Sequence, residues 1–267
     1  MSKIVLITGA SSGFGESCAH LYAKQGFKLI LVSRRLDKLQ QLAQALLLEN
    51  GSAYPASNVL CWAVDVTDAE AIDQFVNELP ESFGAVDILI NNAGLALGTA
   101  PAHKANLSDW ETMVDTNIKG LIRMTHKLLP GMVARNRGHI VNIGSIAGNW
   151  PYPGGNTYCA TKAFVHQFSL ALRADLLGKA IRVSHIDPGM AETNFSRIRM
   201  KGDNDAADAF YHDVKPLSAD DVADIIVWTT SVPEHININS LEVMPVCQAW
   251  SPFAIDRTME NKQIIND

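Results

Sequence analysis

Short runs of β-branched and other apolar residues recur along this chain, and a helical pattern follows most of them. The runs cover residues 4–7, 28–32, 59–64, 86–90, 139–143, 181–186 and 239–243. Strands that alternate with helices at this rhythm predict a parallel sheet with helices on both faces. We therefore expect an α/β fold with a doubly wound parallel sheet of about seven strands.

The length of the chain limits how many domains it can form. With 267 residues, nearly half of them apolar, it suffices for one α/β domain with a tail or for two small domains. No internal repeat, low-complexity stretch or linker divides it. We therefore expect a single domain over residues 1–267. The irregular, charge-rich segment 190–216 is predicted to be a substrate loop, and residues 246–267 a C-terminal tail.

The charge balance narrows the classes of partner. The net charge is −6 and no run of Lys or Arg occurs. Both features argue against a broad nucleic-acid footprint and against a polybasic membrane contact. We expect a small-molecule or nucleotide ligand, with no nucleic-acid and no membrane partner.

The cysteines and the N-terminus indicate a reducing compartment. The cysteines are scattered, without a C-x-x-C pair or a neighbouring His at ligand spacing; they are Cys18, Cys61, Cys159 and Cys247. This pattern predicts neither a zinc site nor a disulfide framework. The apolar run at residues 4–7 is too short for a signal peptide, and no stretch approaches the ~20 apolar residues of a membrane span. We predict a cytoplasmic protein with free thiols and no metal.

A glycine-rich stretch joins the first predicted strand directly to a helical pattern. Residues 8–15 read Thr-Gly-Ala-Ser-Ser-Gly-Phe-Gly. Glycines in this position let the backbone approach a pyrophosphate, and the helix N-terminus favours the negative charge. The spacing is G-x-x-x-G-x-G instead of G-x-G-x-x-G, so a tight turn without a ligand is the alternative. We predict a nucleotide-binding loop.

Two arginines end the second predicted strand. In a dinucleotide-binding sheet, an acidic residue about 20 residues beyond the glycines holds the ribose of NAD, whereas an arginine accommodates the 2′-phosphate of NADP. This chain has Arg34 and Arg35 there, and Asp37 follows too late. A guanidinium suits bidentate phosphate contact. The sequence therefore predicts NADP in preference to NAD, with a solvated strand end as the alternative.

Polar and turn-forming residues gather where the predicted strands end. Those at the carboxyl ends are Arg34, Asp65, Asn91, Ser145 and Pro188. Random polar residues would not prefer one edge of a sheet. Because doubly wound sheets bind their ligands beyond this edge, we expect the ligand site there.

Tyr158 and Lys162 are four residues apart in a segment, 156–178, that is predicted to be helical. This spacing places both side chains on one helix face. A nearby ammonium favours the phenolate and lowers the pKa of a phenol from its usual value of about 10. The pair is a candidate acid/base unit, although such pairs also occur by chance on solvated helices.

Taken in order, these motifs resemble the short-chain dehydrogenase/reductase family over nearly the whole chain. They are residues 8–15, Asn91-Asn92-Ala93-Gly94, Asn117, Ser145, Tyr158 to Lys162, and Pro188-Gly189. Within the family, the chain is similar to the NADP-dependent 3-hydroxy acid dehydrogenases, also described as serine 3-dehydrogenase-like, in segments 92–98, 142–145, 150–152, 154–156, 163–165, 237–239 and 242–246. The resemblance implies a Rossmann-type fold, NADP as the cofactor, and a homo-oligomer that is a dimer or tetramer.

The resemblance also implies a role for each site residue. Tyr158 would act as general acid/base, Lys162 would lower its pKa and bind the nicotinamide ribose, and Ser145 would hold the substrate oxygen. Asn117 would keep a water in a proton path behind Lys162. The implied substrate residues are Ser145, Tyr158 and Arg199. The implied cofactor residues are Gly9, Ser11, Ser12, Gly13, Phe14, Gly15, Arg34, Arg35, Asp65, Val66, Asn92, Ala93, Gly94, Tyr158, Lys162, Pro188, Gly189 and Thr193.

Three functions are compatible with these residues. The first, which we expect, is an NADP-dependent oxidoreductase interconverting a secondary alcohol and a carbonyl on short 3-hydroxy acids or on L-serine and L-allo-threonine. The second is a carbonyl reductase of broad specificity, because fold and catalytic set do not fix the substrate. The third is a non-catalytic NADP-binding sensor or scaffold, which has no physical need for the full catalytic set. Three basic residues of segment 190–216 either meet a substrate carboxylate or face water; they are Arg197, Arg199 and Lys201.

Overall fold

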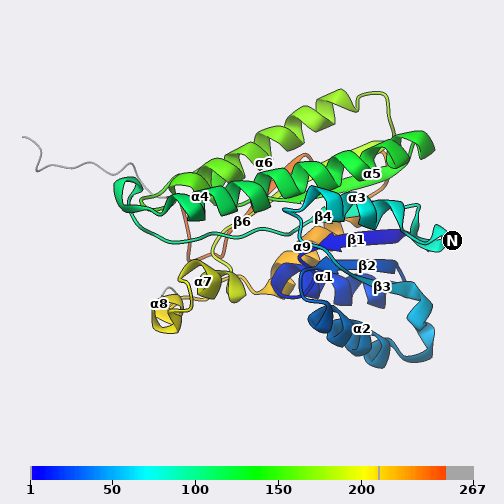
Figure 1. The fold of residues 1–267 in the computed structure, drawn as a ribbon, viewed down its shortest axis with the longest axis horizontal. Coiled ribbons are helices and arrows are strands. Elements are labelled where there is room, and N and C mark those ends of the chain that lie inside the picture. Colours follow the sequence, from blue (N-terminus) through cyan, green and yellow to red (C-terminus); the bar gives the residue numbers. More distant parts are fainter. Residues whose placement is uncertain (1, 210, 251–267) are drawn as a thin grey trace, which may run out of the picture.

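The fold is that of a computed structural model, which describes residues 2–209 and 211–250 (Figure 1). All seven strands are parallel and form one sheet in the order β3-β2-β1-β4-β5-β6-β7. They are β1 (Ile4–Thr8), β2 (Lys28–Ser33), β3 (Val59–Ala63), β4 (Ile88–Asn91), β5 (Gly138–Ile143), β6 (Ile181–Pro188) and β7 (Ser240–Val243). The predicted doubly wound, Rossmann-type sheet is confirmed.

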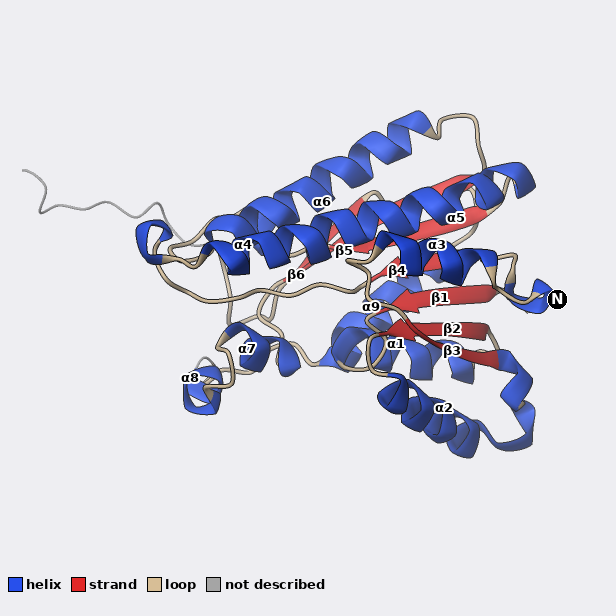
Figure 2. Ribbon diagram, in the orientation of Figure 1, coloured by secondary structure: helices blue, strands red, loops and turns tan. Residues whose placement is uncertain are grey.

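Helices cover both faces of the sheet (Figures 1 and 2). One face packs against α1 (Gly13–Lys24), α2 (Leu36–Asn50) and α9 (Ala219–Ser231). The other packs against α3 (Ala69–Asn77), α5 (Leu121–Arg135) and α6 (Asn156–Asp175). Within the described part of the chain, no helix combines the length and the apolar character that crossing a bilayer requires.

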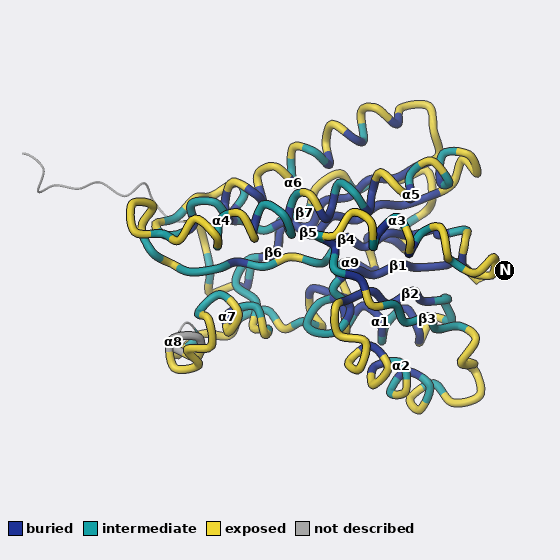
Figure 3. Tube along the Cα trace, viewed as in Figure 1, coloured by how far each residue is buried: buried dark blue, intermediate teal, exposed yellow. Residues whose placement is uncertain are grey.

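The central strands β1 and β4 and most of β2 consist mainly of buried apolar residues, because helices cover both faces of the sheet there. Successive side chains of a strand point to opposite faces. In β1, Val5 and Ile7 therefore enter the core beneath α1 and α2, while Ile4 and Leu6 enter the core beneath α3 and α5. Figure 3 shows the buried strands in the middle and the exposed outer sides of the helices. This rigid sheet fixes the edge from which the functional loops leave.

The helical segment that begins at Leu107 is interrupted. Its parts are α4 (Leu107–Val114), a π-helical turn (Asp115–Gly120) and α5. Single π turns within α-helices are frequent at functional sites. The turn carries Asn117, whose buried amide bonds both main-chain polar groups of Leu95. Hydrophobic periodicity does not detect such a local change of pitch.

The segment predicted to be irregular, 190–216, contains two short helices. These are α7 (Asn194–Arg199) and α8 (Asn204–Ala209). Thr193 caps α7 by accepting the N–H of Phe195 at 3.2 Å. The predicted tail, 246–267, falls within the described residues only as far as Trp250, whose indole N–H donates to Glu242 at 2.9 Å. Residues 251–267 lie outside the described part.

Candidate active site

A cavity of about 670 Å³ lies beyond the carboxyl ends of the strands. Three of the predicted site residues, Gly15, Asn117 and Arg199, are outside its wall. The others line it: Gly9, Ser11, Ser12, Gly13, Phe14, Arg34, Arg35, Asp65, Val66, Asn92, Ala93, Gly94, Ser145, Tyr158, Lys162, Pro188, Gly189 and Thr193. The fold thus brings together residues that are up to 184 positions apart in the sequence, from Gly9 to Thr193.

Two glycines let the loop after β1 lie against the end of β4. Gly9 has a φ of +66°, and a Cβ atom there would lie 2.9 Å from Nδ2 of Asn92. A Cβ atom at Gly15 would lie 2.6 Å from the carbonyl oxygen of Gly9, so Gly15 packs under the loop and not at the cavity. The amide of Asn92 ties the two segments by donating to the carbonyls of Thr8 and Gly9 at 2.9 and 3.2 Å. No side chain fits between them, so the backbone itself forms the cavity wall.

The N-terminus of α1 meets the cavity at this loop. Its N-cap residue is Ser12, whose side chain makes no capping hydrogen bond. Ser11, Ser12 and Gly13 all line the cavity. An uncapped helix N-terminus with a positive dipole end suits a phosphate. The loop therefore fits the pyrophosphate of a dinucleotide.

Arg34 and Arg35 extend this site beyond the end of β2. Both are exposed and both line the cavity. Arg35 reaches back to the glycine-rich loop, because its Nη2 donates to Oγ of Ser11 at 2.9 Å. Asp65, by contrast, accepts the N–H and the hydroxyl of Thr67 at 2.9 and 2.8 Å and stabilises its own turn. The charge on this side of the cavity is positive and fits an additional phosphate group.

Ser145 lies at the start of the loop that follows β5. Its N–H donates to Oδ1 of Asp187 at 2.8 Å, and its Oγ accepts the N–H of Ala147 at 3.2 Å. The side chain of Ser145 also forms a hydrogen bond with Tyr158. Loops from two strands and one face of α6 therefore converge on this serine.

Tyr158 and Lys162 lie on one face of α6, as predicted, and both are buried at the cavity. Nζ of Lys162 lies 5.8 Å from the centroid of the Tyr158 ring and donates to the carbonyl of Ile143 at 2.8 Å. Burial lowers the pKa of Lys162 to about 8, and the charge of Asp187 opposes that shift.

The pKa of Tyr158 differs from the prediction made for it. Burial raises the pKa, while the hydrogen bond with Ser145 lowers it to a smaller extent. Lys162 does not produce the expected decrease, since its ammonium lies over the face of the ring and bonds a carbonyl. Tyr158 is therefore protonated at neutral pH, which is the form that can donate a proton.

Asn117 lies behind the cavity and not in its wall. Its Oδ1 accepts the N–H of Leu95 at 2.8 Å, and its Nδ2 donates to the carbonyl of Leu95 at 2.8 Å and to Oγ1 of Thr161 at 3.0 Å. The amide thus fixes the loop after β4 against α6. A Cβ atom at Gly94 would lie 3.2 Å from Oδ1 of Asn117 and 3.6 Å from Nζ of Lys162. The predicted water-holding role stays a prediction.

Two of the three basic side chains at positions 197, 199 and 201 have acidic partners. Lys201 forms an ion pair with Asp109 at 2.7 Å, which ties the segment to α4. Arg197 lies 3.9 Å from Asp208 of α8. Both basic residues line the cavity, but their charges are partly balanced.

Arg199 has a different environment. Its guanidinium lies 5.2 Å from the centroid of the Tyr152 ring, and its buried Nε has no hydrogen-bond partner among the described residues. Its positive charge also opposes the increase in the pKa of Tyr158. Of the three basic residues, Arg199 is therefore the one whose charge acts on the predicted acid/base.

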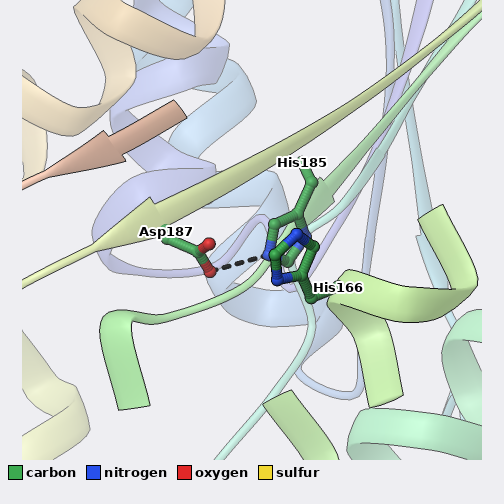
Figure 4. Close-up of side chains that lie close together, drawn as sticks. All are labelled: His166, His185 and Asp187. Carbon is green, nitrogen blue, oxygen red and sulfur yellow. Dashed lines mark ion pairs between the residues drawn. The ribbon is translucent and has the colours of Figure 1, made fainter. Parts of the chain in front are cut away.

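Sequence reasoning missed a group of residues directly beneath the site. His166, His185 and Asp187 lie together (Figure 4), and Asp187 accepts the N–H of Ser145. Asp187 had a signal in the sequence, since it ends a strand immediately before Pro188. The histidines had none, because His166 and His185 come from different elements, α6 and β6. The sequence also gave no signal for the apolar wall residues Leu95, Ile143, Phe195 and Ile198.

A family model described as short chain dehydrogenase matches residues 3–203, and the chain belongs to this family. It is 50% identical to sulfoacetaldehyde reductase 2 of Chromohalobacter salexigens, over 96% of this chain and 100% of the relative. It is 49% identical to the NADP-dependent 3-hydroxy acid dehydrogenase YdfG of Escherichia coli (strain K12), over 95% and 99%. The solved closed form of serine dehydrogenase complexed with NADP+ superimposes with a TM-score of 0.90 at 49% identity, covering 95% and 99%. The predicted family is confirmed.

Proposed function

We propose that this protein is an NADP-dependent oxidoreductase that interconverts a secondary alcohol and a carbonyl, on short 3-hydroxy acids or on L-serine and L-allo-threonine. One observation carries the proposal: a Ser-Tyr-Lys group and a cationic phosphate site share a single cavity. Relatives named as NADP-dependent 3-hydroxy acid dehydrogenase and serine dehydrogenase support it. Family membership alone would leave the substrate open.

The cofactor site that we propose follows the wall of the cavity. The glycine-rich loop and the N-terminus of α1 would hold the pyrophosphate, Arg34 and Arg35 the additional phosphate, and Lys162 the nicotinamide ribose. When bound, NADP supplies the hydride chemistry. The protein contributes binding, orientation and the proton.

Tyr158 is the proposed general acid/base. Because burial keeps its phenol protonated, Tyr158 donates its proton to the carbonyl oxygen in reduction, and the phenolate takes it back from the hydroxyl in oxidation. The hydroxyl of Ser145 donates a hydrogen bond to the same oxygen, where negative charge develops. Lys162 contributes through the nicotinamide ribose, and its ammonium lies 5.8 Å from the centroid of the Tyr158 ring.

Arg199 is the proposed anchor for an acidic substrate, within a substrate loop over residues 190–216. Its guanidinium stacks on Tyr152 next to Tyr158, and a guanidinium binds a carboxylate or sulfonate through paired hydrogen bonds. Relatives whose names denote a 3-hydroxy acid, serine and sulfoacetaldehyde all act on molecules that carry an anionic group. This similarity favours an acid over an uncharged ketone.

The decisive experiment is an NADPH absorbance assay that compares malonic semialdehyde with uncharged ketones of similar size. The substitution Arg199→Met should raise KM for malonic semialdehyde about ten-fold or more and leave KM for the uncharged ketones unchanged. Arg197→Met is the matched control, since Arg197 already lies near Asp208. A lack of NADPH turnover on any of these compounds would contradict the proposed activity. Equal effects of Arg199→Met on the acid and on the ketones would point to a broad carbonyl reductase.

We also propose that the chain assembles as a homodimer or homotetramer. The outer face of α6 supports this proposal: Phe164 and Leu170 are each 38% exposed, and Phe164 stacks on Phe168. Apolar side chains that gather on one exposed face are typical of an interface. Light scattering coupled to size-exclusion chromatography tests it, and a monomeric mass is the contrary result.

A further inference from the structure

A buried carboxylate lies beside two histidines (Figure 4) and contacts Ser145 of the proposed catalytic group. Asp187 is the residue before Pro188 at the end of β6, and its side chain is 1% exposed. Its Oδ1 accepts the N–H of Ser145 at 2.8 Å and lies 2.7 Å from Nε2 of His185, which is fully buried. A charged group is retained in such surroundings only when it has partners. These contacts need an explanation beyond the fold.

The second oxygen of Asp187 also has a partner. Nδ2 of Asn149 donates to Oδ2 at 3.3 Å, and Oδ1 of Asn149 lies 2.8 Å from Nδ1 of His166. His166 stacks on His185, with ring centroids 4.8 Å apart and an interplanar angle of 7°. The contacts close into a ring around the carboxylate. Since His166 lies one helical turn beyond Lys162 on α6, the ring adjoins the catalytic face of this helix.

The three titratable residues of the ring are also of the types that bind divalent metals. Their ligand atoms lie within 4.8 Å of one another. However, the direct contact of 2.7 Å between His185 and Asp187 leaves no space for an ion between them. The stacked rings also place their in-plane lone pairs in parallel planes instead of directing them to one point. The geometry fits a support for Asp187, made of the close contact with His185 and the hydrogen bond from Asn149, better than a metal centre.

Lys162 is the other group that feels this carboxylate. Its ammonium has a neutral hydrogen-bond partner, the carbonyl of Ile143 from β5, and the amide of Asn117 from the π turn lies on the same side of Gly94. The titratable groups near it, on α6 and β6, are Tyr158, His166, His185 and Asp187. Among these, Asp187 supplies the negative charge that opposes the effect of burial on the lysine. One side chain therefore acts on Ser145 through a hydrogen bond and on Lys162 through its charge.

We propose that Asp187 is a positioning residue of the catalytic centre, whose carboxylate fixes the main chain of Ser145 and acts on Lys162, which bonds the carbonyl two residues before Ser145. His185 and Asn149 hold this carboxylate in place. The inference rests on the proposed function, because it concerns the groups to which proton transfer is assigned there.

Two substitutions separate the hydrogen bond from the charge. Asp187→Asn keeps an acceptor oxygen for Ser145 but removes the charge. The pH at which kcat/KM declines on the alkaline side should therefore fall by about one unit, with little change below that pH. Asp187→Glu keeps the charge but is one methylene longer. The alkaline decline should then stay where it is, while kcat falls roughly ten-fold or more because Ser145 is displaced.

Asp87 is the matched control for a lost buried carboxylate. It lies at the opposite edge of the sheet, where Oδ2 accepts the N–H of Ile4 at 2.9 Å and Oδ1 pairs with Arg137 at 2.7 Å. Asp87→Asn removes the same charge and should lower stability, but it should leave the alkaline decline of kcat/KM unchanged. A shift of equal size in both Asn variants would overturn the assignment to Asp187.

A second readout needs no catalytic activity. Competitive acetylation with acetic anhydride across pH, mapped by mass spectrometry, gives the pH midpoint of Lys162 in the free protein, expected at about 8 in the wild type. The midpoint should fall in Asp187→Asn and stay constant in Asp87→Asn. If the wild type has no turnover but the midpoint still falls, the proposed function fails and the charge effect survives. If the wild type turns over and neither quantity moves, the inference about Asp187 fails.

Asn149→Ala covers the case in which Asp187→Asn does not fold, because Asn149 is exposed. The variant removes a hydrogen-bond donor from Oδ2 of Asp187 and leaves the charge in place. We expect kcat to fall about two- to ten-fold, with an unchanged alkaline decline and an unchanged KM for the cofactor. An unchanged kcat in this variant would contradict the positioning role.

Discussion

The two halves of the cavity are built in different ways. The half beyond β1 and β2 is made largely of backbone, since Gly9 and Gly15 leave no room for side chains and the N-terminus of α1 meets the cavity there. Arg34 and Arg35 add charged side chains at the end of β2. The half beyond β5 and β6 is made of side chains that other segments hold in place. Lys162 bonds the carbonyl of Ile143, and Ser145 bonds Asp187.

This difference separates binding from chemistry. A backbone-built site holds a phosphate with fixed dipoles that do not titrate, so its performance depends on space. A site made of side chains depends on their protonation. Burial favours the neutral form of both groups, so it raises the pKa of Tyr158 and lowers the pKa of Lys162. Changes in one half should therefore alter cofactor affinity, and changes in the other should alter kcat.

The largest effect is expected from Tyr158→Phe, in the side-chain half. The variant loses the proposed proton donor and keeps the ring that packs 5.6 Å from Phe195. We expect kcat to fall about 10²- to 10⁴-fold. The affinity for NADPH, measured by fluorescence titration, should stay within about two-fold of the wild-type value. Turnover at the wild-type rate would refute the assigned role.

Tyr54→Phe is the control for the loss of a buried phenol. Tyr54 is 2% exposed, and its hydroxyl donates to the carbonyl of Phe27 at 2.8 Å, away from the cavity. This variant should lower stability by about 1 kcal/mol without changing kcat. A comparable loss of kcat in both variants would mean that the phenol acts through stability.

A smaller effect is expected in the backbone-built half when both Arg34 and Arg35 are replaced by Ala. Their charges point to the additional phosphate of NADP, so kcat/KM with NADP should fall about 10- to 100-fold while NAD is unaffected. Lys38→Ala, an exposed change on α2, is the charge control. Steady-state assays with both cofactors measure the preference. A wild type that uses NAD and NADP equally well would remove the basis for this assignment.

The sheet and its ligand edge could be predicted because their signals are local. The run at residues 139–143 gave strand β5 (Gly138–Ile143), and the residue expected at its end, Ser145, lines the cavity. Glycine spacing likewise marks the loop at Gly9, where only a residue without Cβ fits. In each case a few consecutive residues determine the backbone.

The rest of the site depends on contacts between residues that are far apart in the sequence. Asp187 contacts Ser145, which lies 42 positions earlier in the sequence, and Lys201 contacts Asp109, which lies 92 positions earlier. The expectation for the pKa of Tyr158 was wrong for the same reason, because burial is a property of the folded chain and raises the pKa of this phenol. The periodicity of residues 107–134 also concealed the π turn.

Gly9→Ala tests whether the backbone-built half depends on space. A methyl group there would lie 2.9 Å from Nδ2 of Asn92 in a left-handed backbone conformation. Gly26→Ala is the control, since Gly26 has a φ of +78° but nothing within 4 Å of the added carbon. Both should lose about 1 kcal/mol of stability through strain. Only Gly9→Ala should weaken NADPH binding, roughly ten-fold, in a fluorescence titration. Equal binding in both variants would show that the close contact is unimportant.

No effect on catalysis is expected when a buried titratable group at the opposite edge of the sheet is replaced. His139, at the start of β5, is 2% exposed and shares a hydrogen bond of 2.8 Å with Oγ of Ser184. Burial, together with the charges of Arg182 and Lys3, lowers its pKa to about 3, against about 6.5 in the unfolded chain. Below pH 6.5 the unfolded state therefore binds more protons than the folded state, and stability falls as the pH falls.

Because of this histidine, the free energy of unfolding of the wild type should fall by about 2 kcal/mol when the pH is lowered from 7 to 5. In His139→Gln that part of the pH dependence should disappear, which urea unfolding at the two pH values measures. The pH profile of kcat/KM should be the same in both proteins, because His139 lies at the amino edge and outside the cavity wall. If the variant instead shifts the pH profile of kcat/KM, the protonation of His139 affects the active site. The amino edge of the sheet would then not be independent of catalysis.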